Sequence, residues 1–282
     1  MNEQGDVMRS YARPHTLTQA MDLMAQAPRR ILAGGTDLYP AAGPQLDGDV
    51  LDLTGIPSLV GISTEDGLRI GACTTWSAIA DSYLPPAFTC LQQAARQVGG
   101  RQVQNVGTIG GNLCNASPAA DGVPPLLVLD AMVELLGQSG TRRMPLAEFL
   151  TGPRQTQRQT DEVLTAVIVP KPALRGTSAF VKLGARAYLV ISIAMVAARV
   201  ELAEGRVSRA AIAVGACSGV AQRLPTVETA LIGAAVAEAP DRVCDVDLAT
   251  ALAPIDDVRA SAAYRQTAAA ELVRRAVKEA LA

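Results

Sequence analysis

The sequence predicts a protein of mixed helices and strands in two domains, and three observations support this prediction. Short strand hairpins alternate with amphipathic helices as far as Pro170. A Lys171-Pro172 linker follows, and the chain beyond residue 175 is rich in strands before it ends in one long helix. The chain has 282 residues, enough for two ordinary domains. We therefore place the first domain at residues 1–175 and the second at residues 176–282.

The first domain is expected to alternate short elements. A helix over residues 16–27 has Thr16 as its N-terminal cap and Pro28 after its end. The other expected elements are strands at 30–33 and 50–53, a hairpin at 59–71 with Gly67 in its turn, helices at 75–82 and 88–98, a hairpin at 132–144 and a strand at 163–169. Residues 99–125 are rich in Gly, Pro, Asn and Asp, so we predict a long irregular connection with a functional role.

The second domain is expected to begin with strands and to end in helices. The predicted elements are strands at 180–183, 191–202 and 207–217, a short helix at 225–232 and a terminal helix at 261–281. Glu204-Gly205 joins the last two strands. Tyr264, Ala268, Leu272 and Ala276 are expected on the apolar stripe of the terminal helix.

Composition and charge exclude several classes of protein. Lys and Arg number 25 against 27 Asp and Glu, and aromatic residues are only 3%, so we expect no nucleic-acid binding. The N-terminal residues lack the apolar core of a signal peptide, and no apolar stretch approaches the ~20 residues of a membrane helix. We therefore expect a cytoplasmic protein without membrane insertion. The five cysteines are far apart, which predicts buried thiols and no zinc, iron–sulfur or other metal site in this chain.

Two glycine-rich segments carry the chemistry. ILAGGTDL at residues 31–38 is a strand that runs into a Gly-Gly turn, and TIGGNLCNASPAAD at residues 108–121 surrounds two glycines with hydroxyl, amide and carboxylate groups. Glycine lets backbone amides approach an anion without interference from a Cβ atom. The pair predicts a ligand with two phosphates and a polar body; two unrelated loops are the alternative.

Together these segments resemble the paired flavin signatures of the molybdenum hydroxylases. The similar family is the FAD-binding medium subunit of xanthine dehydrogenase-type enzymes and of aerobic carbon monoxide dehydrogenase. The resemblance continues through LRIGACTTWSAIADS at 68–82, FVKLGARAYLVISIAMVAARV at 180–200 and RLPTVETALIG at 223–233. It implies an α+β fold, with a two-part FAD-binding domain of the vanillyl-alcohol-oxidase/p-cresol-methylhydroxylase type. A smaller α/β C-terminal domain of the carbon monoxide dehydrogenase flavoprotein type follows.

The same resemblance implies which residues contact FAD. These are Ile31, Leu32, Ala33, Gly34, Gly35, Thr36, Asp37, Leu38, Val98, Thr108, Ile109, Gly110, Gly111, Asn112, Asp121, Leu164 and Lys182. Residues 31–38 and 108–112 would form two pyrophosphate loops, with amide contacts from Gly110 and Gly111. Asp121 would contact the hydroxyl-bearing part of the cofactor, and the Leu164 backbone would contact the flavin.

Three further residues define expectations at the flavin. No side chain is expected to be catalytic, but Lys182 is expected to stabilise negative charge on the reduced flavin; a solvated lysine is the alternative. Val98 stands where some relatives carry an aromatic residue, so stacking is not expected there. Val190 stands where many relatives carry Asp, which removes a polar contact.

The resemblance also implies cofactors, partners and a reaction. His15, the single histidine, matches no flavin-linking position, so FAD is expected to be non-covalent. A large partner subunit would hold a molybdenum cofactor and a small one two [2Fe-2S] clusters, in a dimer of heterotrimers. Electrons would pass to FAD and on to NAD or another acceptor. TGPRQT at 151–156 resembles bacterial xanthine dehydrogenase flavin subunits and favours a purine or other N-heterocycle as substrate. The alternatives are a carbon monoxide dehydrogenase, an aldehyde oxidase, or a stand-alone flavin-binding protein.

Overall fold

The computed structural model describes residues 10–43, 46–64, 67–187 and 189–282. Its strands form a parallel sheet β1-β3-β2, an antiparallel sheet β4-β5-β10-β6-β7, an antiparallel sheet β11-β12-β13-β14 and a hairpin β8-β9. The strands are β1 (Tyr11–Ala12), β2 (Arg30–Leu32), β3 (Val50–Asp52), β4 (Ile62–Ser63), β5 (Leu68–Gly71), β6 (Met132–Gly137), β7 (Gly140–Pro145), β8 (Leu150–Gly152), β9 (Gln155–Thr156), β10 (Val163–Val169), β11 (Thr177–Leu183), β12 (Ala194–Ala203), β13 (Arg206–Gly215) and β14 (Gln222–Arg223).

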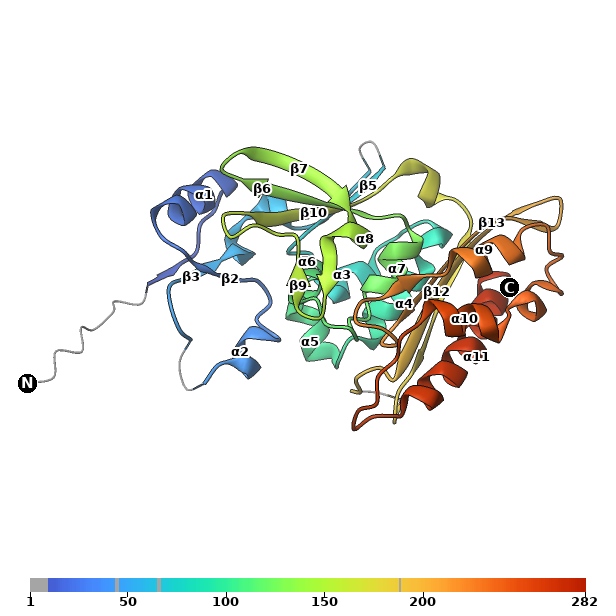
Figure 1. Ribbon diagram of the computed structural model, residues 1–282. Helices are drawn as coiled ribbons and strands as arrows, with labels where there is room; N and C mark the ends of the chain where they lie inside the picture. The colour runs from blue at the N-terminus through green and yellow to red at the C-terminus, as the bar shows by residue number, and fades with distance from the viewer. Residues whose placement is uncertain (1–9, 44–45, 65–66, 188) are drawn as a thin grey trace, which may run out of the picture.

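The helices connect and cover these sheets. They are α1 (Leu17–Gln26), α2 (Leu38–Ala41), α3 (Trp76–Asp81), α4 (Thr89–Gln97), α5 (Arg101–Val106), α6 (Ile109–Asn115), α7 (Val123–Val128), α8 (Leu146–Phe149), α9 (Pro225–Leu231), α10 (Asp245–Ala251) and α11 (Ala262–Ala280). Figure 1 shows the parallel sheet with α1 at one end of the molecule and β11–β14 with α9–α11 at the other. None of these helices, within the ranges described, has the length and apolar character that crossing a membrane requires.

The four-stranded sheet packs against different helices on its two faces. Successive side chains of a strand point to opposite faces. Met195 and Ala197 of β12 belong to the core that also contains α4 and α7, whereas Val196 and Ala198 belong to the core with α11. Figure 1 shows this sheet between α11 and the helices of the first part of the chain. The sheet therefore supports α7 directly, and α7 follows the segment that contains Asp121.

Most of the predicted elements are confirmed with small shifts at their ends. Thr16 caps α1 by accepting the Gln19 backbone N–H at 3.2 Å, and Gly67 has a φ of +120° in the predicted turn. The first strand of that hairpin is wrong, because a 3-10 helix begins at Pro57 and the strand starts only at Ile62. The turn residues 65–66 and residues 1–9, used above to exclude a signal peptide, lie outside the described residues.

The prediction of an irregular connection at residues 99–125 is wrong, because α5, α6 and the start of α7 lie within it. The Thr108 hydroxyl accepts the Gly111 N–H at 3.1 Å and caps α6. Ile109 and Leu113, four residues apart, are both fully buried on one side of this helix. The glycines and asparagines of this segment are typical of loops, and they obscured the apolar spacing of Ile109 and Leu113 that indicates a helix.

The predicted apolar stripe of α11 is also partly wrong. Tyr264 is 52% exposed, whereas its neighbour Arg265 is 1% exposed. Arg265 is buried because its guanidinium donates to the carbonyls of Ile193 and Ala216 at 2.5 and 3.0 Å and pairs with Asp257 at 2.6 Å. Three of the cysteines, Cys73, Cys90 and Cys217, are buried as expected, but Cys114 and Cys244 are exposed.

Arg199 of β12 joins the sheet to α7 and yields a first prediction. Its side chain is 3% exposed and donates to the Val128 carbonyl at 2.7 Å, and it pairs with Asp130 and Glu201 at 3.3 and 3.1 Å. Its partners Asp130 and Glu201 are 42% and 15% exposed, so the main loss on removing the guanidinium is the buried, charge-assisted hydrogen bond to the Val128 carbonyl, worth about 1.5–3 kcal/mol. Arg199→Met should lower the free energy of unfolding in urea by about this amount.

The control for this prediction is Arg209→Met. Arg209 pairs with the same Glu201 at 3.8 Å, but its side chain is 55% exposed, so the loss should stay within about 1 kcal/mol. Equal losses in the two variants would show that Arg199 does not anchor α7.

Candidate functional site

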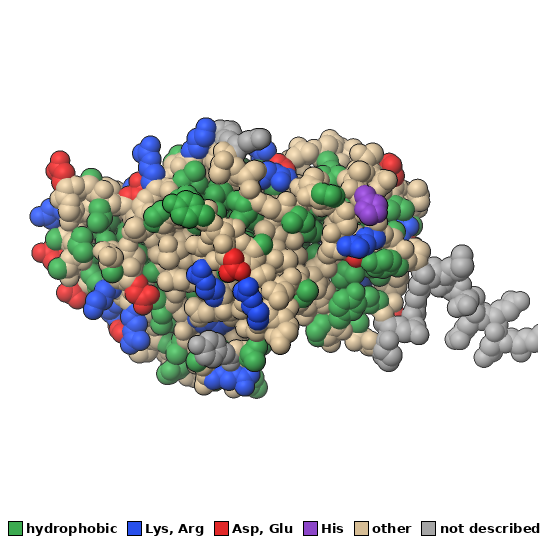
Figure 2. Space-filling view, turned by 180° about the vertical axis from the view of Figure 1, so that it is seen from behind, with side chains coloured by type: hydrophobic (Ala, Val, Ile, Leu, Met, Phe, Trp, Pro, Cys, Tyr) green, Lys and Arg blue, Asp and Glu red, His purple; other side chains and the backbone are tan. Residues whose placement is uncertain are grey.

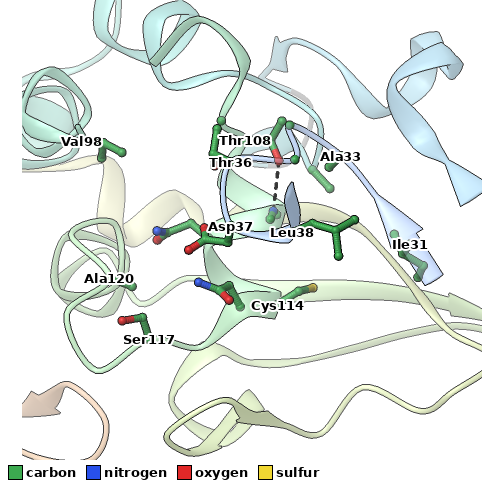
Figure 3. A pocket seen from close by; sticks show the side chains of 18 of the residues that line it. Ile31, Ala33, Thr36, Asp37, Leu38, Val98, Thr108, Cys114, Ser117 and Ala120 are labelled. Atoms are coloured by element: carbon green, nitrogen blue, oxygen red, sulfur yellow. Dashed lines mark hydrogen bonds between the residues drawn. The ribbon is translucent and has the colours of Figure 1, made fainter. Parts of the chain in front are cut away.

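The loop after β2 lies in unusually close contact with a distant part of the chain. A Cβ atom on Gly34 would lie 2.0 Å from the Val106 carbonyl oxygen, and Gly35 has a φ of +69°. Any side chain at Gly34 would force the loop away from the connection between α5 and α6, so this contact requires glycine. The Thr36 hydroxyl oxygen would likewise lie 3.6 Å from a Cβ on Gly107, and Figure 3 shows Thr36 and Thr108 on these two neighbouring segments.

The same loop presents unpaired donors. No acceptor among the described residues lies within hydrogen-bond distance of the backbone N–H groups of Gly34, Gly35, Thr36 and Asp37. A backbone N–H group that is buried without a hydrogen-bond partner costs free energy. Several consecutive N–H groups carry partial positive charge and suit an anion. The loop therefore has the donors that an anionic group requires.

The second glycine segment is arranged differently from our expectation. The Gly110 N–H donates to the Ala72 carbonyl at 2.9 Å and the Gly111 N–H to the Thr108 hydroxyl at 3.1 Å. The amide contacts predicted for these glycines are therefore already made within the protein. A Cβ on Gly110 would lie 2.7 Å from Ala72, so this glycine allows α6 to pack closely. The free acceptor of the segment is Oδ1 of Asn112, which is buried without a partner among the described residues.

These segments line one cavity of about 1220 Å³. All the sequence-predicted contact residues line it except Leu32, Ile109 and Lys182, which lie behind its wall. Sites for drug-sized ligands usually enclose about 300–1,000 Å³, so this cavity fits a larger ligand. It offers such a ligand both the unpaired donors at Gly34–Asp37 and the unpaired acceptor of Asn112.

A carboxylate stands at the cavity wall between two donors. Asp121 accepts from the Lys182 ammonium at 2.6 Å and from the Ser192 hydroxyl at 2.7 Å. Burial raises the pKa of Asp121 above its usual range, although Lys182 and Ser192 oppose this effect. Lys182 itself is only 5% exposed, so the solvated alternative is wrong. Lys182 does not line the cavity itself but pairs with Asp121, which does.

Three apolar residues also line the cavity: Val98, Leu164 and Val190. Val98 and Val190 are the positions at which some relatives carry an aromatic residue and many carry Asp, respectively. The pairing of β10 with β6 shifts register between Leu164 and Ala166. Such irregularities redirect the backbone and are common beside functional sites. The shift therefore occurs where the backbone of Leu164 borders the cavity.

The structure adds residues that sequence reasoning missed. The β8-β9 hairpin contributes Arg154, Thr156 and Arg158 to the cavity wall. The Arg154 N–H donates to the Ala116 carbonyl at 2.8 Å and its guanidinium to the Asn115 carbonyl at 3.3 Å, so the hairpin crosses the end of α6. The TGPRQT segment contains Arg154 and Thr156, so a polar turn with an arginine was the available signal for these residues.

The fold and the cavity suit a protein that binds a large ligand with an anionic group. Comparison with known families makes this specific: residues 6–172 match the family described as FAD binding domain in molybdopterin dehydrogenase, and residues 179–280 match the CO dehydrogenase flavoprotein C-terminal domain. The chain belongs to the family of FAD-binding subunits of molybdenum hydroxylases, which are oxidoreductases. The predicted family and α+β fold are thus confirmed.

Three relatives illustrate the similarity. The Xanthine dehydrogenase FAD-binding subunit of Escherichia coli O157:H7 is 32% identical over 97% of this chain and 96% of its own. The Nicotinate dehydrogenase FAD-subunit of Eubacterium barkeri is 38% identical over 64% of each chain. The structure of reconstituted CO dehydrogenase from Oligotropha carboxidovorans contains a chain with a TM-score of 0.86 and 28% identity, and the match covers 97% of both chains.

The contact at Gly34 gives a second prediction. Gly34→Ala should weaken FAD binding about tenfold or more, because overpacking of about 1–3 kcal/mol must displace the donor loop. The measurement is titration of the flavin-free chain with FAD, followed by the quenching of flavin fluorescence. Gly43→Ala is the control, since a Cβ there meets nothing within 4 Å. Unchanged FAD affinity in the Gly34 variant would show that this loop does not bind the cofactor.

Proposed function

We propose that this chain binds FAD non-covalently in the cavity, with the cofactor's phosphates on the loop at Gly34–Asp37. The observation that carries the proposal is the set of backbone N–H groups in this loop that have no acceptor in the part of the chain that the structure describes. The unpaired Oδ1 of Asn112 would accept from a hydroxyl or amine group of the cofactor, and Asp121 from a further hydroxyl. Val98 and Leu164 would provide apolar wall and exclude water.

When bound, the flavin supplies the redox chemistry, and the protein positions it and sets its electrostatic surroundings. We propose an electron-transfer role: electrons arrive from two [2Fe-2S] clusters in a small partner subunit, after substrate is oxidised at a molybdenum cofactor in a large one. NAD or another acceptor takes them up. We propose a dimer of such heterotrimers in the cytoplasm. The scattered cysteines support this division of labour, because clusters held by one chain need closer cysteines.

For the substrate of the complex we propose a purine or another N-heterocycle. The names of the xanthine and nicotinate dehydrogenase relatives support this choice. The likeness to a CO dehydrogenase chain keeps carbon monoxide as the second candidate. We also propose the domain boundary at residues 175 and 176, supported by the sheet β11–β14, which lies wholly after it. On the face in Figure 2, acidic and basic side chains are interspersed, in keeping with partners other than nucleic acid.

The experiment that tests FAD binding is an absorption spectrum of the purified full chain, before and after acid releases its chromophore. We expect free FAD close to one per chain and no iron. A colourless chain that also fails to take up added FAD would overturn the proposal. Co-purification of molybdenum and iron–sulfur subunits from the native source would distinguish an electron-transfer subunit from a stand-alone flavin-binding protein.

Lys182 gives a third prediction. Lys182→Met removes a positive charge behind Asp121, so a gain of negative charge by the bound cofactor becomes less favourable. We expect the flavin midpoint potential to fall by about 30 mV, a tenfold change for a two-electron couple. Lys278→Met, on the exposed side of α11, is the matched control and should leave the potential unchanged. Equal midpoint potentials in the unaltered chain and both variants would show that Lys182 has no electrostatic effect on the flavin.

A further inference from the structure

Three charged side chains from the last part of the chain form a compact cluster, which we call the Asp257 clamp. Asp257 accepts from the Arg259 guanidinium at 3.0 and 2.5 Å through Oδ2 and from Arg265 at 2.6 Å through Oδ1. Arg259, and then Arg265, hold the pKa of Asp257 well below its usual range. Asp257 therefore fixes both guanidinium groups in one arrangement.

The two arginines of the clamp hold backbone carbonyls of another segment. Arg259 donates to the Ser192 carbonyl at 3.2 Å, and Arg265 donates to the Ile193 carbonyl at 2.5 Å. Arg265 also donates to the carbonyl of Ala216 at 3.0 Å. Charge-assisted hydrogen bonds are stronger and more directional than neutral ones. The clamp therefore fixes the chain just before β12 and just after β13.

Both of these segments touch the cavity wall. The Ser192 hydroxyl, fully buried, donates to Asp121 at 2.7 Å, and the Ala216 N–H donates to the Pro118 carbonyl at 3.0 Å. Ala216 has a φ of +62°, a conformation that needs support from its surroundings. Ile191, next to Ser192, lines the cavity. Ser192 thus connects the clamp to the cavity: its carbonyl accepts from Arg259 and its hydroxyl donates to Asp121.

The burial of Arg265 indicates that this arrangement is costly. Its Nε has no partner among the described residues, and its side chain is 1% exposed. Well-packed apolar residues often replace a buried ion pair without loss of stability. A contribution to geometry accounts for the charge better than a contribution to stability does.

We infer that Asp257, Arg259 and Arg265 are positioning residues for the flavin site: by holding the Ser192–Ile193 and Ala216 backbone, they place Asp121 where it contacts the cofactor. This inference rests on the proposed function, in which Asp121 accepts from a cofactor hydroxyl. No residue of the clamp lines the cavity, so its effect on FAD passes through Ser192 and Pro118.

The test uses Arg259→Met in the full chain, because Arg259 is 32% exposed and its replacement should not prevent folding. Loss of one charge-assisted contact should weaken FAD binding about tenfold. It should also change the visible circular dichroism of the bound flavin, which a uniform loss of stability would not alter. Arg259→Lys should restore part of both signals.

Arg274→Met is the matched control. Arg274 is 33% exposed, donates to the Val243 carbonyl at 3.0 Å and pairs with Asp245, but it has no hydrogen bond to the cavity segments. We expect a similar shift in thermal unfolding with unchanged FAD affinity and circular dichroism. Equal effects of the two variants on FAD would overturn the inference and leave the clamp a stabilising feature only.

A double-mutant cycle tests the route through Ser192. If the clamp acts through the Ser192–Asp121 contact, Ser192→Ala should reproduce the change in circular dichroism, and adding Arg259→Met should weaken FAD binding little further. Additive losses in affinity would contradict this route. Failure of the proposed function would look different, since the unaltered chain would then bind no FAD at all.

Discussion

The close contact between Gly34 and the Val106 carbonyl is the constraint on which the cavity depends. It brings together two segments that are about seventy residues apart in sequence, one after the parallel strand β2 and one at the end of α5, just before α6. The N–H groups of Gly34–Asp37 have no acceptor among the described residues and are available to a ligand. The missing side chain at Gly34 therefore lets this donor loop pack against the end of α5 at the cavity wall.

The second segment is held in place by backbone hydrogen bonds from one neighbouring stretch of chain. The N–H groups of Ile109 and Gly110 donate to the carbonyls of Thr74 and Ala72, and the Trp76 N–H donates to the Gly107 carbonyl. This pairing fixes the start of α6 but occupies the amides that the family resemblance assigned to the cofactor. The two glycine segments consequently differ in the groups that they present to a ligand. The first offers donors, whereas the second offers Asn112 and a rigid support.

Much of this arrangement could be predicted from sequence because it depends on local signals. Gly34-Gly35 and Gly110-Gly111 mark close approaches, and these need no knowledge of the partner surface to be recognised. What escaped prediction depends on tertiary pairing. Arg265 carries a charge that is normally exposed, and its burial is explained by the carbonyls of Ile193 and Ala216 together with the carboxylate of Asp257. Composition likewise concealed α6, because glycine and asparagine are typical of loops.

The C-terminal part of the chain has a role beyond covering the first. Its sheet places Arg199 against the end of α7, and Ser192 and Lys182 bind both oxygens of Asp121. Asp121 and α7 are adjacent in sequence, so both groups of contacts hold one short stretch of chain that begins at the cavity wall. Burial raises the pKa of Asp121, and the donors on its two oxygens oppose this effect. Among the described residues both donors belong to the second part of the chain, so the position of Asp121 at the cavity depends on contacts between the two parts.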